Sequence, residues 1–344
     1  MKNNIDLSKY NVRTDLIIEN IDNTTNNEKI EKKEQDNITI TTIKVDNNLS
    51  STINRKQGNY ITIEFDDITN YEDREKVGKY LEQELKKIIK INKINNKEEC
   101  LIIGLGNSKS TPDSLGPKVI DKILVTRHLF ELNTNIEKGI RKVSALSPGV
   151  MANTGIETYD IITSLINKIK PKFLIVIDAL ASSSIDRINK TIQITDTGIH
   201  PGSGVGNNRK ELSKDTLNIP VIAIGVPTVV DSTTIVSDTI TYLFRHLSYI
   251  KNNYHQNKLV FKRSNKYIDK IKDNDLSQEE KKELSGIIGI LSEKEKKELI
   301  NEVLTSINYN LIVTPKEIDF LIDKLSEVIS SSINNSLHQS INNY

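Results

Sequence analysis

Three short apolar runs in the middle of the chain constrain its fold more than any other feature. They cover residues 100–103, 173–177 and 220–226. Runs that are apolar on both faces are typical of strands buried in a parallel sheet. Stretches with helical spacing lie between and after them, near 115–131, 155–169 and 232–248. This alternation predicts an α/β protein with an open, largely parallel sheet, helices on both faces and a phosphorylase/hydrolase-like architecture.

The N-terminal part is polar and rich in Asn, but it contains structural signals of its own. Residues 38–45 alternate between apolar and polar positions, and 60–65 form a second such run, so both predict strands. Over 71–92 apolar residues recur at helical spacing, opposite Glu and Lys. We therefore expect a β-rich arm and a helix over 16–95, followed by a core over 96–250.

The chain beyond the core is charged and helical. Ser277 and Ser292 are each followed three residues later by Glu, which is the pattern of a capping box at a helix start. Thr314-Pro315 is another start signal, because proline is favoured in the first helical turn, and an apolar stripe follows it. These signals predict a helical extension over 251–344.

Composition limits the partners and the compartment. Lys and Arg total 47, Asp and Glu total 46, and the net charge is +1, so we expect no direct binding of nucleic acid. Cys100 is the only cysteine, which excludes an internal disulfide and a cysteine-built zinc site. The N-terminus does not read as a signal peptide, and no stretch approaches the ~20 apolar residues that span a membrane. We therefore expect a cytoplasmic protein without membrane contact.

Carboxylates follow the apolar runs, where an α/β sheet binds its ligands. Asp113, Asp178 and Asp231 lie in the three loops after the runs. Two carboxyl groups that converge there are able to run hydrolysis, because the ionised one takes a proton from water while its protonated neighbour donates to the carbonyl. We select Asp113 and Asp178 as the catalytic pair and interpret Asp231 as a helix cap. From spacing alone, a cap or a strand-end turn also explains Asp113 and Asp178.

Glycine-rich loops supply further candidates for the substrate site. The candidate residues are Asn107, His200, Gly202, Gly204 and Arg209. Arg209 is included because recognition of a carboxylate needs a fixed cation, but a solvated surface charge and a plain surface loop explain the same residues. The sequence has neither the His-Glu-x-x-His helix of zinc proteases nor the Gly-x-Ser-x-Gly elbow of serine hydrolases. Cys100 is interpreted as a core residue.

Long motifs occur in order along most of the chain. They cover residues 104–107, 111–117, 146–151, 176–181, 196–207, 224–231 and 311–319. Two of them read Thr111-Pro112-Asp113-Ser114-Leu115-Gly116-Pro117 and Val176-Ile177-Asp178-Ala179-Leu180-Ala181. Together these motifs resemble those of the spore germination protease family, and the resemblance covers nearly the whole chain.

The resemblance implies an endopeptidase that degrades small acid-soluble DNA-binding spore proteins at germination. It implies an atypical aspartic peptidase, similar in fold to the hydrogenase maturation proteases, whose two carboxylates correspond to Asp113 and Asp178. It also implies a homotetramer that resides in the cytoplasm of the forespore and in the spore core. The sequence offers no compact set of metal ligands, so we expect no metal ion and no cofactor.

The resemblance also implies a zymogen that removes its own propeptide at a site similar to its substrates. Those substrates are cut after an acidic residue and before a large apolar one, with Glu further on. Thr14-Asp15-Leu16-Ile17-Ile18-Glu19 has this arrangement. We predict cleavage between Asp15 and Leu16, which gives a propeptide over 1–15 and a catalytic α/β domain over 16–344.

Three other interpretations remain. A metal-dependent endopeptidase of the hydrogenase-maturation type would need a partner protein that presents nickel. An aminoacyl-ester hydrolase of the peptidyl-tRNA type also has a Gly-Leu-Gly-Asn strand end, but it would need a catalytic histidine near that strand and a basic face. A non-enzymatic module that binds spore proteins would use its acidic residues only for structure.

Overall fold

The computed structural model describes residues 14–21, 29–132, 135–202, 209–253, 274–305 and 311–339. Their contacts divide the chain into two compact units. The larger unit contains the described parts of 13–182, 186–229 and 314–344, and the smaller unit contains 183–185 and the described parts of 230–313. The predicted division into propeptide, arm, core and extension remains a prediction.

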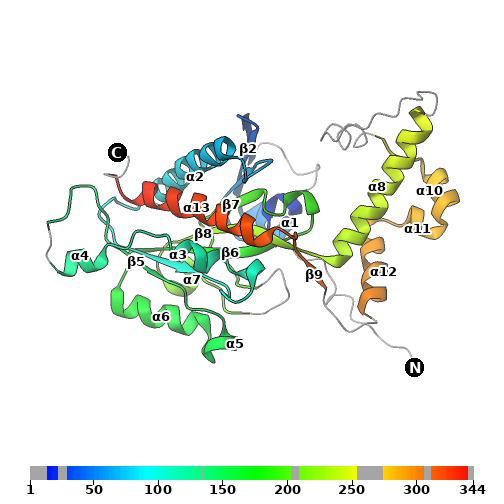
Figure 1. The fold of residues 1–344 in the computed structure, drawn as a ribbon. Helices are drawn as coiled ribbons and strands as arrows, with labels where there is room; N and C mark the ends of the chain where they lie inside the picture. The colour runs from blue at the N-terminus through cyan, green and yellow to red at the C-terminus, as the bar shows by residue number, and fades with distance from the viewer. Residues whose placement is uncertain are drawn as a thin grey trace. The chain divides into compact units, whose positions relative to one another are not determined.

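One mixed sheet of nine strands runs through the described residues (Figure 1). The strands are β1 (Ile30–Gln35), β2 (Ile38–Val45), β3 (Gly58–Glu64), β4 (Cys100–Gly104), β5 (Val143–Leu146), β6 (Phe173–Ser182), β7 (Thr191–Thr195), β8 (Val221–Asp231) and β9 (Ile312–Val313). Their order is β1-β2-β3-β7-β8-β6-β4-β5, and β9 pairs with β8. β4 is parallel to both β5 and β6. In the other half of the sheet, the pairs β1–β2, β2–β3, β3–β7 and β7–β8 are antiparallel. The predicted α/β class is confirmed, and the predicted N-terminal strands belong to the same sheet.

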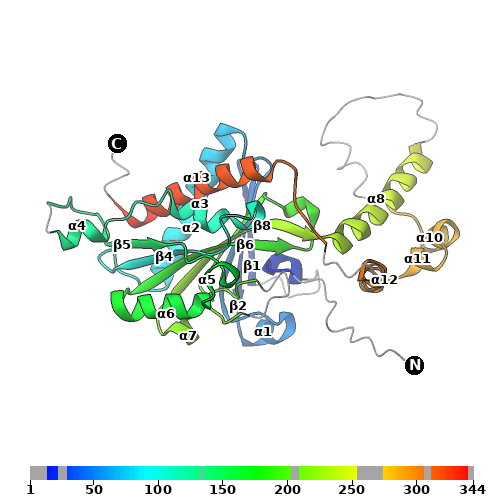
Figure 2. The same ribbon diagram turned by 60° about the horizontal axis from the view of Figure 1, so that its bottom comes forward.

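Side chains of the parallel strands alternate between two apolar layers, as expected for strands buried on both faces. Alternate residues of β4 and β6 pack with α2 (Tyr71–Ile91), α3 (Leu115–Ile120) and α13 (Ile318–Leu337) on one face. The intervening residues pack with α6 (Thr158–Ile169) and α7 (Lys214–Leu217) on the other. Figure 2 shows α3 and α13 on one side of these strands and α6 and α7 on the other. The predicted helices on both faces are thus confirmed.

Helices also connect the strands and form the smaller unit. The larger unit further contains α1 (Asn47–Ile53), α4 (Arg127–Glu131) and α5 (Met151–Thr154). The smaller unit contains α8 (Ser232–Asn253), α10 (Gln278–Ser285), α11 (Ile287–Ile290) and α12 (Glu293–Thr305). The capping boxes predicted at Ser277 and Ser292 are present at the starts of α10 and α12.

Two predicted helices differ in their bounds. The stretch near 115–131 contains two helices, because α3 ends at Ile120 and α4 begins only at Arg127. Between them, the Thr126 N–H donates to the carbonyl oxygen of Val143 at 3.0 Å. The Thr314-Pro315 signal precedes its helix: α13 begins at Ile318, whose N–H donates to the carbonyl oxygen of Pro315 at 3.2 Å. Proline therefore shapes the turn before this helix.

Candidate active site

Asp113 lies in the loop that follows β4. A 3₁₀ turn over Thr111–Asp113 leads from this loop into α3. The loop closes on itself, because the Asn107 N–H donates to the carbonyl oxygen of Asp113 at 2.9 Å. Gly106 allows this closure: its φ is +109°, and an added Cβ would lie 2.1 Å from the same carbonyl oxygen. The Asp113 residue is half-buried.

Asp178 lies on β6, one residue beyond the last that pairs with β4. The parallel register of the two strands ends at Gly104↔Ile177. β6 continues to Ser182, because β8 flanks its other side, so Asp178 lies within the strand and not in a loop after it. The residue is 6% exposed, and its Oδ1 accepts the Ala179 N–H at 2.9 Å. Since β4 and β6 are neighbours, Asp113 and Asp178 lie at the same edge of the parallel strands.

Burial raises the pKa of both carboxyl groups. At Asp178, burial raises the pKa well above its usual value, and the charges of Asp113 and Asp15 raise it further. At Asp113, burial raises the pKa, while a backbone hydrogen bond from Asn107 and the charge of Arg209 lower it. Of the two groups, Asp178 is therefore the one that keeps its proton to higher pH.

The other candidate residues have different surroundings. Arg209 is near enough to lower the pKa of both Asp113 and Asp178 by its charge. Asn107 shapes the Asp113 loop, and its Oδ1 also accepts the Lys109 N–H at 3.0 Å. His200 is exposed, with its Nε2 3.4 Å from Oε2 of Glu211. Gly202 has φ +72°. Gly204 lies outside the described residues.

The segment with the predicted cleavage site lies against the strand that carries Asp178. The Asp15 N–H donates to the carbonyl oxygen of Ala181 at 3.1 Å, and the Ala181 N–H donates to Oδ2 of Asp15 at 2.9 Å. Leu16 and Ile17 are both 0% exposed. The structure thus brings Asp15 and Leu16 to the end of β6, near enough for the Asp15 charge to raise the pKa of Asp178.

A hydrogen bond and an ion pair to Glu19 hold the same segment further along the chain. Ser182 Oγ donates to Oε1 of Glu19 at 2.6 Å, and the Arg187 guanidinium lies 3.4 Å from the same oxygen. Arg187 also lies 3.2 Å from Glu64. The Glu19 side chain is 2% exposed, so its carboxylate is buried with a cation and a hydroxyl as partners, as a buried charge requires.

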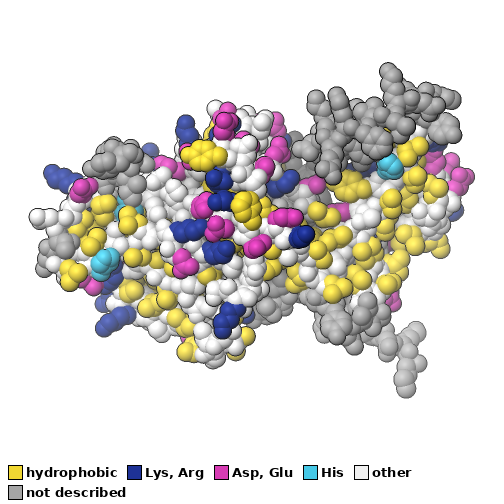
Figure 3. All heavy atoms as spheres, in the orientation of Figure 1, with side chains coloured by type: hydrophobic (Ala, Val, Ile, Leu, Met, Phe, Trp, Pro, Cys, Tyr) yellow, Lys and Arg dark blue, Asp and Glu magenta, His cyan; other side chains and the backbone are white. Residues whose placement is uncertain are grey.

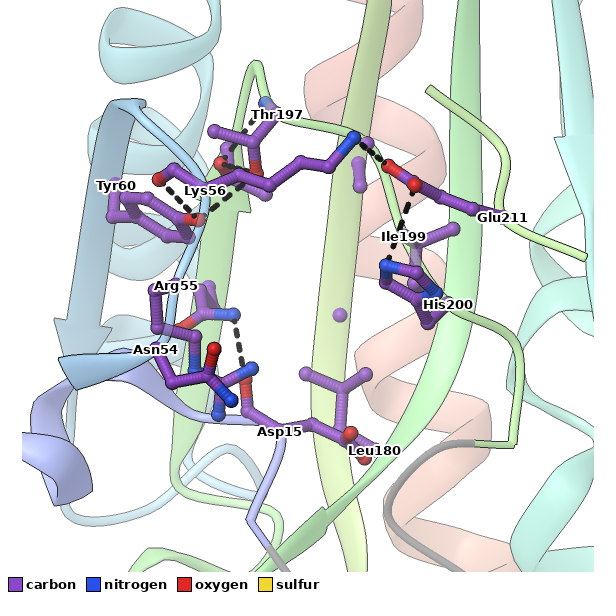
Figure 4. A pocket seen from close by; sticks show the side chains of 15 residues that line it. Asp15, Asn54, Arg55, Lys56, Tyr60, Leu180, Thr197, Ile199, His200 and Glu211 are labelled. Carbon is purple, nitrogen blue, oxygen red and sulfur yellow. Dashed lines mark hydrogen bonds and ion pairs between the residues drawn. The ribbon is translucent and has the colours of Figure 1, made fainter. Parts of the chain in front are cut away.

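A pocket with a volume of about 140 Å³ lies beside this segment. Asp15 and Leu180 are at one end of the pocket, and Lys56, His200 and Glu211 are at the other (Figure 4). Lys56 Nζ lies 2.5 Å from Oε1 of Glu211. The pocket therefore extends from Asp15 to His200.

The remaining sequence predictions concern residues outside this site. Asp231 accepts the Thr233 N–H at 2.7 Å at the start of α8, which confirms its interpretation as a cap. Cys100 is fully buried in β4, and burial raises the pKa of its thiol, so its core position is confirmed. Among the described residues, no three His, Cys, Asp or Glu side chains gather as metal ligands would. No described helix combines the length and apolar character needed to span a membrane.

Several residues that lie at the site were not predicted from the sequence. Gln193 and Arg187 reach the N-terminal segment from β7 and from the turn before it. Lys56 and Glu211 reach the pocket from connecting segments. The single usable signal is the position of Gln193, a long polar side chain in the middle of the run Thr191-Ile192-Gln193-Ile194-Thr195. A buried amide of this kind needs hydrogen-bond partners.

The fold and the site define an α/β protein with two carboxyl groups of raised pKa at the edge of its parallel strands. The germination protease family model matches residues 8–344. The germination protease of Bacillus licheniformis (strain ATCC 14580) is 47% identical, over 99% of this chain and 97% of the relative. Those of Bacillus cereus (strain AH187) and Bacillus mycoides (strain KBAB4) are each 44% identical over the same shares. The chain belongs to the germination protease family, and it is an endopeptidase of spore germination.

One solved structure offers a much weaker comparison. The NiFe hydrogenase maturation protease HycI from Thermococcus kodakarensis KOD1 is 20% identical, with a TM-score of 0.28. The match covers 42% of this chain and 80% of that one. A similarity of this size carries no argument about the site.

Proposed function

We propose that this endopeptidase is a self-processing zymogen in which Asp113 and Asp178 act as a general base and a general acid. The observation that carries the proposal is their placement at the edge of two adjacent parallel strands, where the charge of Asp113 raises the pKa of buried Asp178. Paired carboxyl groups whose environments separate their pKa values divide the roles of acid and base between them. This makes the chain an atypical aspartic peptidase.

The chemistry follows from these protonation states. Ionised Asp113 takes a proton from water, whose oxygen then bonds to the carbonyl carbon of the scissile peptide. Neutral Asp178 donates a hydrogen bond to the carbonyl oxygen, where negative charge develops. The carbon–nitrogen bond breaks as the proton held by Asp113 passes to the leaving nitrogen. Activity should therefore fall at high pH, where Asp178 ionises, and at low pH, where Asp113 is protonated.

We propose the Asp15–Leu16 bond as the processing site. The supporting observation is the position of Asp15, which hydrogen-bonds to both the backbone N–H and the carbonyl oxygen of Ala181. Ala181 lies on the strand that carries Asp178. Glu19 also supports this processing site, because Ser182 and Arg187 bind its buried carboxylate. A glutamate at this distance after the cut is part of the substrate pattern to which the sequence conforms.

The mature enzyme is proposed to cut small acid-soluble spore proteins after acidic residues, in the cytoplasm of the forespore and in the spore core. Family membership supports this substrate class. We further propose that the enzyme works as a homotetramer, that it binds no nucleic acid directly, and that it uses no metal ion or other cofactor.

The proposal is tested by following self-processing of the purified full-length chain by mass spectrometry and N-terminal sequencing. Leu16 is the expected first residue. Asp113→Asn and Asp178→Asn should each slow processing by about a thousandfold, since each removes one of the two proton-transfer groups. Asp66→Asn, at an exposed carboxyl, is the matched control and should process normally. A different first residue rejects the cleavage site, and normal processing by Asp113→Asn rejects the carboxyl pair.

A second assay separates the alternative functions. The processed enzyme is incubated with a small acid-soluble spore protein, with and without a chelator, and the fragments are weighed. Cuts after acidic residues that resist the chelator support the proposal. Cleavage that the chelator stops favours a metal-dependent peptidase, and an intact substrate favours a binding module.

A further inference from the structure

Gln193 is a buried amide in the middle of the sheet. It lies on β7, where it is 7% exposed and its backbone is opposite Gly225 of β8 and Thr62 of β3. A buried amide must satisfy both its N–H and its carbonyl groups, and an unsatisfied group costs stability. The partners of Gln193 are therefore informative about its role.

Both partners belong to the N-terminal segment. Gln193 Nε2 donates to the carbonyl oxygen of Asp15 at 3.2 Å, and Gln193 Oε1 accepts the Ile17 N–H at 2.7 Å. The two contacts fix the orientation of the amide, because exchanging its nitrogen and oxygen would lose both of them. The side chain thus spans the backbone on both sides of Leu16 and contacts the carbonyl of the proposed scissile bond.

We propose that Gln193 is a further catalytic residue, whose Nε2 donates to the oxygen that becomes negatively charged when water adds to the scissile carbonyl. The inference rests on the proposed cleavage between Asp15 and Leu16. As the new carbon–oxygen bond forms, the electron pair of the carbonyl moves onto the Asp15 oxygen, next to the Gln193 N–H. When the carbon–nitrogen bond breaks, that pair returns to the carbonyl and the leaving nitrogen of Leu16 takes the proton. A fixed donor at this oxygen stabilises the transition state.

Release of the propeptide makes the same donor available to other substrates. The fragment that departs carries the Asp15 carbonyl, whereas Ile17 stays with the mature chain. Ile17 is fully buried in a cluster with Ile43, Val45 and Leu49, so its N–H keeps Gln193 Oε1 oriented. The Nε2 donor then faces the place where the carbonyl of an incoming peptide would lie. The acidic residue of that peptide would take the position of Asp15 beside Ala181.

The test compares self-processing rates of full-length Gln193→Met and Gln193→Glu chains. Gln193→Met keeps a similar size without the donor and should slow processing by about a hundredfold. Gln193→Glu is equally slow at about pH 8.5, where the carboxyl group has lost its proton and has none to donate. At about pH 4.5 a protonated carboxyl reproduces the donor and acceptor of the amide, so its rate relative to the wild type should rise at least tenfold.

The controls address folding, surroundings and the dyad. Gln83→Met and Gln83→Glu change an exposed glutamine of α2 and should process normally at both pH values. Charged groups that line the same pocket are Asp15, Arg55, Lys56, His200 and Glu211. The wild type contains the same groups, so each variant is compared with the wild type at the same pH. Thermal melting identifies any variant that does not fold. If Gln193→Met does not fold, the test depends on the processing rate of Gln193→Glu relative to the wild type at the two pH values.

The outcomes separate this inference from the proposed function. A Gln193→Met chain that processes at the wild-type rate overturns the role of Gln193, as does a Gln193→Glu ratio that does not change between the two pH values. Asp113→Asn is measured in parallel. If it is inert, such results reject only the role of Gln193; if it processes normally, the proposed carboxyl pair itself is rejected.

Discussion

Asp178 is a carboxyl group that the fold keeps among apolar neighbours. It continues a strand whose preceding residues, Phe173 to Ile177, are all 0% exposed. Desolvation there disfavours the charged form, and the nearby charges of Asp113 and Asp15 act in the same direction. The environment that raises the pKa of Asp178 should therefore affect the stability of the protein as well.

Stability should depend on pH through Asp178 with a definite sign. Its folded pKa lies well above the usual 3.8, so between these two values the folded state binds more protons than the unfolded state. The free energy of unfolding then falls as pH rises through this window, by at most about 1.4 kcal/mol per pH unit from this group. Asp178→Asn removes the effect, and its stability relative to the parent should increase between about pH 4 and pH 7.

Urea unfolding of full-length chains at several pH values measures this difference. Both chains carry Asp113→Asn to prevent processing, which leaves burial, the largest cause of the shift, in place. Asp66→Asn in the same background is the control, because Asp66 is exposed. A stability difference between Asp178→Asn and its parent that stays constant with pH would contradict the prediction.

The sequence carries enough information to select the two carboxyl groups, but not their surroundings. Asp113 and Asp178 are predictable because each follows a run of buried parallel strand, and parallel neighbours end at the same edge. The run 191–195 marks Gln193 as a polar residue among apolar ones, but its partners are not predictable, because they depend on β7 joining β3 and β8 and on a segment 176 positions away in the sequence. Long-range pairing of this kind leaves no local pattern.

At the scale of elements, the connection from β4 to α3 sets the position of Asp113. It is compact because backbone approaches backbone without side chains between them. An added Cβ at Gly104 would lie 2.3 Å from the carbonyl oxygen of Gly116, and one at Gly106 would lie 2.1 Å from that of Asp113. Glycine at these positions brings the helix and the Asp113 loop close to the strand.

Gly106→Ala should therefore damage both stability and activity. We expect a loss of about 3 kcal/mol in the free energy of unfolding, from backbone strain at φ +109° together with the clash at Asp113, and a matching loss of self-processing. Gly155→Ala is the matched control: its φ is +70°, but an added Cβ meets nothing within 4 Å, so about 1 kcal/mol is expected. Equal costs for the two changes, measured by urea unfolding, would show that close approach does not matter in this loop.

The elements themselves were predictable to different degrees. β2, β3, β4, β6 and β8 follow from alternating or continuous apolar runs, and α2 and α6 follow from helical spacing. β1 reads Ile30-Glu31-Lys32-Lys33-Glu34-Gln35, and five of its six residues are exposed at the edge of the sheet, so it lacks an apolar pattern. β5 has 4 residues, and β7 has Gln193 in the middle of its apolar run and pairs with β3 and β8. Tertiary pairing decides such segments.

At the scale of the whole molecule, the smaller unit exposes many apolar side chains. Figure 3 shows apolar side chains gathered over the helices of this unit. The exposed ones are Val236, Leu243, Leu247, Ile250, Leu284, Ile287, Ile288, Ile290, Leu299, Val303, Leu311, Ile312 and Val313. Exposed apolar patches of this extent mark surfaces that bind other proteins. We expect this surface to form the contact between copies of this chain in the proposed homotetramer.

Placing a charge on this surface should therefore break the assembly. Ile287 is 72% exposed on α11, and Ile287→Glu would bury an unpaired carboxylate in the contact, which costs several kcal/mol per site. By size-exclusion chromatography with light scattering, the wild type should elute with the mass of four chains, and Ile287→Glu with a lower mass at the same concentration. Leu132→Glu is the matched control, because Leu132 is 71% exposed but belongs to the larger unit. A wild type with the mass of one chain contradicts the assembly, and an Ile287→Glu chain that keeps the full mass excludes this surface as the contact.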